Sequence, residues 1–202
     1  MRDDDRLLTS WARVIDAIFR GERPRQSMVL LGPTPPLLQQ LGLRPVDLAM
    51  AAGKIAQCRR DHPEVPLSVW HDLPRLVGKP IAVVPSAKRD HSLVVVLVVS
   101  DAQGDPVVVP IVPGLHGSPN TVLSMYGKQA GHNWIRKQIE QAARDALPHF
   151  ISKGFAATLP QPGSARAIPS SPGPIPADGT AKPPRQILRP REKSIGEPDE
   201  PR

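Results

Sequence analysis

Two runs of β-branched residues in the middle of the chain constrain the fold more than any other feature. Between Ile81 and Pro113 the sequence contains the arms IAVVPSAKRDHSLVVVLVVS and DPVVVPIVP, separated by DAQG. Valine and isoleucine favour strands, and Asp101, Gly104 and Asp105 are typical turn residues. Short connections join antiparallel strands, so this segment predicts a β-hairpin at the centre of the core.

Helical patterns lie on both sides of this hairpin. Apolar residues recur at helical spacing over residues 7–19 and again over the closing segment WIRKQIEQAARDAL, residues 134–147. Prolines predict the first turns of a short helix at residues 35–41 and of a third helix at residues 45–62. A short helical turn before the hairpin and a brief strand at residues 121–126 complete the pattern. This order predicts the α+β class, with N-terminal helices, a small antiparallel β-sheet and a closing helix.

Composition divides the chain into three parts. Many of the 26 prolines follow Leu159, in a stretch with almost no periodic apolar pattern. Such a segment buries too little apolar surface to offset the entropy of ordering it. We therefore expect an N-terminal helical extension at residues 1–27, an α+β domain at residues 28–156, and a disordered, proline-rich, basic tail at residues 157–202.

Charge and cysteine content limit the function classes. The net charge of +7 is compatible with a polyanionic partner, although arginines and lysines of the tail contribute to it. Cys58 is the only cysteine, so the chain has no internal disulfide and no multi-thiolate metal site. The histidines lack the spacing of a metal motif, and we assign neither a metal nor a cofactor. The N-terminus lacks an apolar signal region and no run is long enough to span a membrane, so we expect a cytosolic protein.

Four sequence blocks carry a resemblance to a known family. They are LGPTPPLLQQLG, KIAQCRRDHPEV, DLPRLVGKPIAVV and NTVLSMYGK. In this order they resemble the MuF C-terminal domain of phage proteins over about residues 28–146. That family is similar to the phage members of the barnase, EndoU, colicin and RelE-like nuclease group, in which helices precede a four-stranded antiparallel sheet.

The resemblance implies a ribonuclease-like toxin of a phage or mobile element. Such a domain acts on RNA in the cytoplasm of the bacterial host and is held in check by an immunity or antitoxin protein. The residues that match the family's polar positions lie before and after the hairpin. They are Lys54 and His62 in the third helix, and Asn120, Ser124, Tyr126 and Lys128 on and after the last strand.

The same residues suit metal-free cleavage of RNA. This reaction needs a base for the 2′-hydroxyl, an acid for the leaving 5′-oxygen, and donors for the developing phosphorane charge. His62 can act as base or acid near neutral pH, and Lys54 can stabilise charge. Ser124 and Tyr126 can donate hydrogen bonds. We predict these four as catalytic residues, and a second set as substrate-binding residues: Lys128, Asn120, Trp134 and Arg136.

Each candidate also has a purely structural explanation. His62 lies near a helix C-terminus, where the helix dipole favours positive charge. The Tyr126 hydroxyl can be satisfied at the edge of the core, and Trp134 can be buried against the sheet. The lysines can be ordinary solvated side chains. A second hypothesis therefore stays open, in which the domain is a non-catalytic binding or structural module of a phage or mobile element. The oligomeric state is open too.

Overall fold

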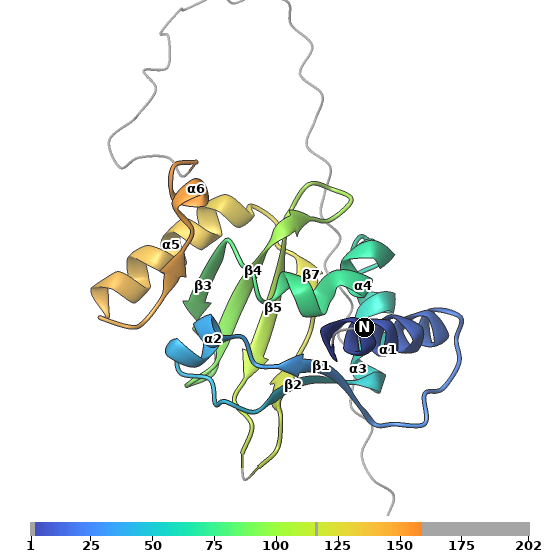
Figure 1. Ribbon diagram of the computed structural model, residues 1–202. Coiled ribbons are helices and arrows are strands. Elements are labelled where there is room, and N and C mark those ends of the chain that lie inside the picture. Colours follow the sequence, from blue (N-terminus) through green and yellow to red (C-terminus); the bar gives the residue numbers. More distant parts are fainter. Residues whose placement is uncertain (1–2, 116, 159–202) are drawn as a thin grey trace, which may run out of the picture. The chain divides into compact units, whose positions relative to one another are not determined.

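The valine-rich centre of the chain forms three neighbouring strands. The structure is a computed structural model that describes residues 3–115 and 117–158 (Figure 1). The strands are β3 (Ala82–Pro85), β4 (Leu93–Ser100) and β5 (Pro106–Val112), and they pair antiparallel in succession. The segment therefore contains two hairpins where the sequence predicts one. The polar residues SAKRDHS, at 86–92, interrupt the first arm, and His91 adopts a positive φ of 57° in the turn.

Further strands extend this centre on both sides. On the β5 side follow β6 (Asn120–Val122), β2 (Asp47–Ala51) and the edge strand β1 (Met28–Pro33). On the other side β8 (Phe150–Ile151) pairs with β3, while the short β7 (Tyr126–Gly127) pairs with β5. The β2–β6 pair is parallel, whereas β1 and β2 are antiparallel. The α+β class is confirmed, but the sheet is larger than expected and mixed.

The start of the predicted third helix is wrong. Residues 47–51 form strand β2, and the helix α3 (Ala52–Asp61) begins only afterwards. Leu48, Ala49 and Met50 are almost completely buried, and they pair with β1 on one side and with β6 on the other. Because this backbone pairs on both sides, tertiary hydrogen bonds outweigh the local helical pattern.

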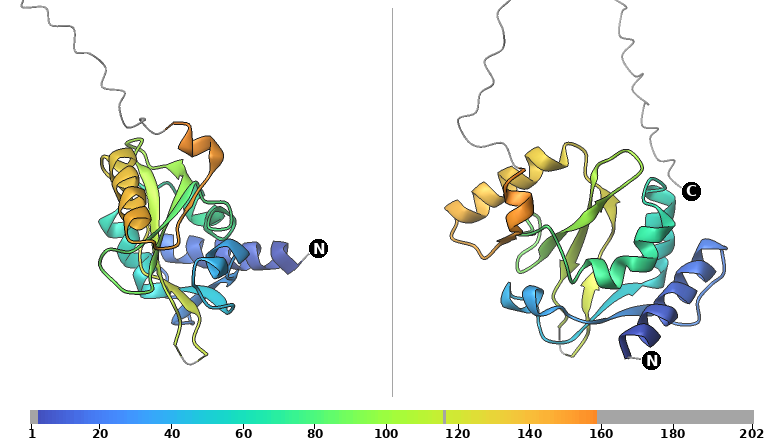
Figure 2. Two further views of the ribbon diagram at one scale, coloured as in Figure 1. Left: turned by 90° about the vertical axis from the view of Figure 1, so that its left-hand side faces the viewer. Right: turned by 45° about the horizontal axis from the view of Figure 1, so that its top comes forward.

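The remaining helices cover the two faces of the sheet. They are α1 (Asp3–Phe19), α2 (Pro36–Gln40), α4 (Leu67–Leu76), α5 (Gly131–Arg144) and α6 (Lys153–Ala156). Figure 2 shows α1 and α5 on opposite sides of the strands. The short helix lies where the sequence predicts it, and the closing helix begins and ends three residues earlier than predicted. Helix α4 is longer than the expected turn.

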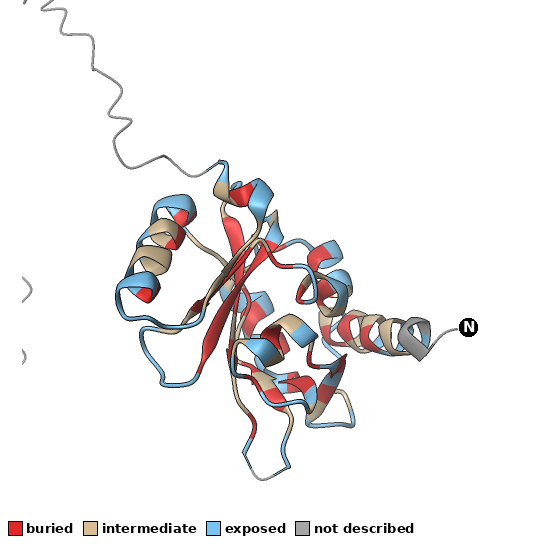
Figure 3. Ribbon diagram, turned by 60° about the vertical axis from the view of Figure 1, so that its left-hand side comes forward, coloured by how far each residue is buried: buried red, intermediate tan, exposed pale blue. Residues whose placement is uncertain are grey.

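Alternate residues of the central strands enter two separate cores. Val95 and Val109 belong to the core that contains side chains from α1, α3 and α4. Val96 and Val108 belong to a smaller core with Ile135 of α5 and Phe155 of α6. Residues 93–97 of β4 and most of β5 are therefore buried on both faces, and these strands are largely red in Figure 3. A strand buried on both faces reads as a continuous apolar run, which explains the sequence pattern.

The N-terminal helix packs into the larger core. The indole Nε1 of Trp11 donates to the backbone oxygen of Trp70 at 2.6 Å, and Phe19 meets the Trp70 ring at a centroid distance of 5.9 Å. Arg59 of α3 donates to the backbone oxygens of Ile18 and Phe19, at the C-terminal end of α1. The expected extension at residues 1–27 thus contributes to the core of the domain. The expected tail at residues 157–202 lies, from residue 159 on, outside the described residues.

A buried amide connects three separate segments beside the sheet. The side chain of Asn120, at the start of β6, is fully buried. Its Oδ1 accepts from the backbone N–H of Gly114 at 2.9 Å. Its Nδ2 donates to Thr34 Oγ1 and to the backbone oxygen of Arg44, both at 2.8 Å. This side chain therefore fixes the loop after β5, the end of β1 and the loop before β2 against one another.

We expect Asn120→Ala to destabilise the fold by about 2 to 4 kcal/mol, because it leaves buried backbone groups unpaired. Urea unfolding followed by circular dichroism measures the change. Thr121→Ala is the matched control, since the Thr121 hydroxyl makes only a 3.4 Å contact with a neighbouring backbone oxygen. Equal unfolding midpoints for the two variants would contradict a structural role for Asn120.

Gly127 provides a second test, because β7 passes very close to the turn between β4 and β5. A Cβ at Gly127 would lie 1.7 Å from Oδ2 of Asp101, whose Oδ1 accepts from the backbone N–H groups of Gln103 and Asp105. Gly127→Ala must displace this carboxylate, and we expect a loss of about 1 to 3 kcal/mol in unfolding free energy. Gly53→Ala, at an open helical position, is the control and should not destabilise the domain.

Candidate functional site

A cavity of about 420 Å³ lies among α3, the β3–β4 loop, the segment around β7 and the start of α5. Four of its lining residues are cationic: Lys54, Lys88, Arg89 and Lys128. Two are aromatic, Tyr126 and Trp134, and the polar ones are Ser86, Ser92, Ser124 and Gln138. None of the described residues that line the cavity is acidic. The cavity therefore combines positive charge, ring surfaces and hydrogen-bonding groups.

Five of the eight residues predicted as site residues line this one cavity. Lys54 comes from the first turn of α3, and Ser124 from the segment between β6 and β7. Tyr126 lies on β7, Lys128 follows it, and Trp134 lies in the first turn of α5. The tertiary structure thus brings together residues from both polar segments that flank the valine-rich centre.

Pairing of β7 with β5 sets the position of Tyr126. Tyr126 is the register partner of Val108, and the backbone N–H of Lys128 donates to the backbone oxygen of Pro106 at 2.9 Å. Burial raises the pKa of the Tyr126 phenol. The hydroxyl is therefore protonated at neutral pH and can donate a hydrogen bond to an anion in the cavity.

His62 lies beside the cavity rather than in its wall. It follows the last residue of α3, and its backbone N–H donates to the backbone oxygen of Cys58 at 2.7 Å. Its ring stacks on Tyr126 with a centroid distance of 5.3 Å and an interplanar angle of 30°. His62 is thus in direct contact with a residue that lines the cavity.

Glu64 orients the His62 ring. Nδ1 of His62 lies 3.2 Å from Oε1 of Glu64. A carboxylate only accepts hydrogen bonds, so this contact favours a proton on Nδ1 and leaves Nε2 as the nitrogen that can take up a further proton. The sequence interpretation missed Glu64, although it follows His62 and Pro63 directly in the chain.

The side chains of Lys128 and Trp134 contact each other at the cavity. Nζ of Lys128 lies 5.3 Å from the centroid of the Trp134 ring, within the range of a cation–π interaction. On α3, Nζ of Lys54 lies 2.9 Å from Oε1 of Gln57. Both lysines keep donors in addition to these contacts, because an ammonium group has three.

Two predicted substrate-binding residues lie away from the cavity. Asn120 uses its amide in the buried network described above. Arg136 of α5 forms an ion pair with Glu140, with 2.8 Å between Nη1 and Oε1, and does not line the cavity.

The β3–β4 loop contributes residues that the sequence interpretation missed. Ser86, Lys88, Arg89 and Ser92 line the cavity, and so does Gln138, one helical turn after Trp134. The signal was present, because SAKRDHS is a polar interruption inside an apolar run. It could have been recognised as a functional loop, since loops carry binding residues more often than strands do.

The described residues give less support for thiol or metal chemistry. Burial raises the pKa of the Cys58 thiol, which lies in the larger core and so stays protonated at neutral pH. Among the described residues, no group of three or more His, Cys, Asp and Glu side chains could hold a metal ion. The described helices include none that is long and apolar enough to cross a membrane.

Part of the chain is similar to a known protein family. No curated protein and no solved structure matches the chain. A family model does match, over residues 54–147, from the first turn of α3 to just beyond α5. This range begins later than the resemblance seen in the sequence blocks, but it contains all eight predicted site residues. Over residues 54–147 the chain is similar to the phage MuF C-terminal domain.

Proposed function

We propose that the cavity binds RNA and that the domain is a metal-independent, ribonuclease-like domain of a phage or mobile element. The observation that carries this proposal is the composition of the cavity. Cationic side chains, two aromatic rings and hydrogen-bonding groups surround it, without a carboxylate among the described lining residues. A ligand that contains both a phosphate and a base matches all three kinds of group.

Each part of a nucleotide has a partner in the cavity. Lys54, Lys88, Arg89 and Lys128 can neutralise phosphate charge and gain free energy from the release of counterions. Tyr126 and Trp134 offer ring surfaces on which an unpaired base can stack. The serine hydroxyls and the Gln138 amide can bond to base edges and to the 2′-hydroxyl that distinguishes RNA.

His62 is the side chain best suited to proton transfer. Its Nε2 can accept the 2′-hydroxyl proton while Nδ1 contacts Glu64. As the 2′-oxygen bonds to phosphorus, the protonated phenol of Tyr126 and the ammonium group of Lys54 can stabilise the charge that develops on the phosphorane. When the bond from phosphorus to the 5′-oxygen breaks, the protonated His62 ring can give its proton to that leaving oxygen. Ser124 can donate a further hydrogen bond. The family match is consistent with a phage-related domain and does not by itself specify this reaction.

One observation favours the non-catalytic alternative. His62 contacts Tyr126 but does not line the cavity, so a bound RNA reaches it only at the edge of the site. In this alternative the cavity binds its ligand without cleaving it, and the domain acts as a binding module. An active enzyme would also need an immunity or antitoxin protein in the cell that produces it, whereas a binding module would not.

RNA binding by the cavity can be tested at Lys128. Lys128→Gln removes one phosphate contact, so we expect weaker binding of single-stranded RNA and a salt slope smaller by about 0.7. Fluorescence anisotropy of a labelled RNA at several salt concentrations measures both effects. Lys137→Gln, an exposed lysine of α5 outside the cavity, is the matched control. If both substitutions weaken binding equally, only net charge matters and the cavity is not the binding site.

Cleavage of RNA in cells separates the enzyme from the binding module. We expect induction of the wild-type chain in bacteria to arrest growth and to produce discrete RNA fragments. His62→Ala should lower cleavage by at least about 100-fold, because it removes the general base or acid, while RNA binding by the purified chain is retained. His132→Ala, an exposed histidine outside the cavity, should cleave like the wild type. Normal growth and intact RNA with soluble wild-type protein would reject the enzyme and favour the binding module.

A further inference from the structure

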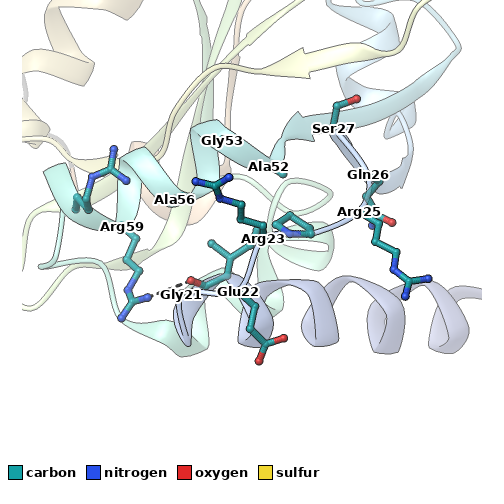
Figure 4. A pocket seen from close by; sticks show the side chains of 13 residues that line it. Gly21, Glu22, Arg23, Arg25, Gln26, Ser27, Ala52, Gly53, Ala56 and Arg59 are labelled. Carbon is teal, nitrogen blue, oxygen red and sulfur yellow. Dashed lines mark hydrogen bonds between the residues drawn. The ribbon is translucent and has the colours of Figure 1, made fainter.

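A second cavity, of about 670 Å³, lies on another side of α3. It is open to the surface and is bordered by the end of α1, the segment 21–27 that joins α1 to β1, and the exposed side of α3 (Figure 4). Small or apolar residues form part of its wall, among them Ile18, Ala52, Gly53 and Ala56. Its arginines are Arg23, Arg25, Arg59 and Arg60. We call it the arginine cavity.

Most of this positive charge is available to a ligand. Arg59 is occupied, because it donates to backbone oxygens of α1 and lies 4.7 Å from the Phe19 ring centroid. In the described part of the chain, Arg23, Arg25 and Arg60 have no hydrogen-bond or ion-pair partner. The carboxylate of Glu22 is 2.6 Å from Nε of Arg20 and is thereby partly neutralised. Figure 4 shows the guanidinium group of Arg23 extending towards Gly53 and Ala56.

The two cavities adjoin the same helical turn. Gly53 lines the arginine cavity, and the next residue, Lys54, lines the cavity that contains Tyr126 and Trp134. Consecutive residues of a helix point about 100° apart, so a ligand can leave one cavity and enter the other across the first turn of α3. Lys54 would then contact the ligand between the two cavities.

We infer that the arginine cavity is a second nucleotide subsite, which holds the RNA strand where it continues beyond the first cavity. Guanidinium groups bind phosphate through paired donors and also stack on bases, and the small side chains of α3 leave room for a flat ring. This inference rests on the proposed function and adds a requirement for the length of the RNA substrate. The preferred RNA is a single strand long enough to span both cavities.

Binding of RNAs of different length tests the inference. Fluorescence anisotropy is measured with labelled single-stranded RNAs of about 4 to about 16 nucleotides, on the 202-residue chain carrying His62→Ala to prevent cleavage. The test variant is Arg23→Gln with Arg60→Gln. Arg13→Gln with Arg75→Gln is the control, since both arginines are exposed, lie outside the two cavities and change the net charge equally.

We expect the parent chain to bind the long RNAs more tightly than the short ones. The test variant should lose about tenfold in affinity for the long RNAs and about 0.7 in salt slope for each lost contact, while binding of the shortest RNAs stays unchanged. The control variant should bind all lengths like the parent. Circular dichroism confirms that both variants fold.

Four results would overturn the inference. An affinity that does not depend on RNA length would exclude the second subsite, and so would equal effects of the test and control variants. The proposed function would still hold in either case if Lys128→Gln weakens binding of the short RNAs. A polyglutamate probe with the same charge as the long RNA tests the alternative ligand. If the test variant binds this probe more weakly than the parent chain does, while its affinity for long RNA is unchanged, the arginine cavity binds an acidic protein segment instead. Absence of RNA binding by the parent chain at every length would overturn the proposed function as well.

Discussion

Burial of both faces of β4 and β5 is the constraint on which the rest of the structure depends. Val96 and Val108 pack towards α5, while Val95 and Val109 pack towards the helices of the opposite face. A strand that is buried on both faces has no exposed face on which polar groups can be arranged. The residues of the candidate site must therefore lie on loops, on short strands and at helix ends around this centre.

The candidate site is assembled by backbone pairing and close packing. β7 is only two residues long, yet its pairing with β5 places Tyr126 against His62 and beside the cavity. The absence of a side chain at Gly127 allows the strand to approach Asp101, whose carboxylate organises the preceding turn. At the start of β6, Asn120 holds the loop after β5 and the end of β1 in place. Structural residues and candidate functional residues thus alternate within a short segment.

The helix α3 connects the features that matter for function. Its first turn supplies Lys54 to one cavity and Gly53 to the other, and His62 follows its last residue. Its buried side carries Ile55 and Cys58, which anchor it in the larger core. Because one rigid helix contacts both cavities and the histidine, the relative positions of these groups depend on how α3 packs against the sheet.

Local sequence patterns were sufficient to predict those elements whose tertiary environment favours the same secondary structure. The periodicity of α1 and α5, the β-branched centre and the polar residues on either side of it indicated the α+β class and most of the candidate site, including Lys54, Tyr126 and Trp134. The amphipathic pattern of a helix and the branched side chains of a strand act over a few residues, so they can be read from the chain directly.

Long-range contacts decided the rest. Residues 47–51 became a strand because β1 and β6 supply hydrogen-bond partners from distant parts of the chain. Asn120 became a structural residue because Thr34 and Arg44 lie beside it only in the folded state. The β3–β4 loop and the arginines near residue 23 acquire their place in a cavity only once α3 has packed. The sequence alone determined the helical periodicity of α1 and α5, the β-branched centre and its polar flanks. The tertiary structure decided that residues 47–51 are a strand and which polar side chains share a cavity, because both depend on contacts between residues far apart in the chain.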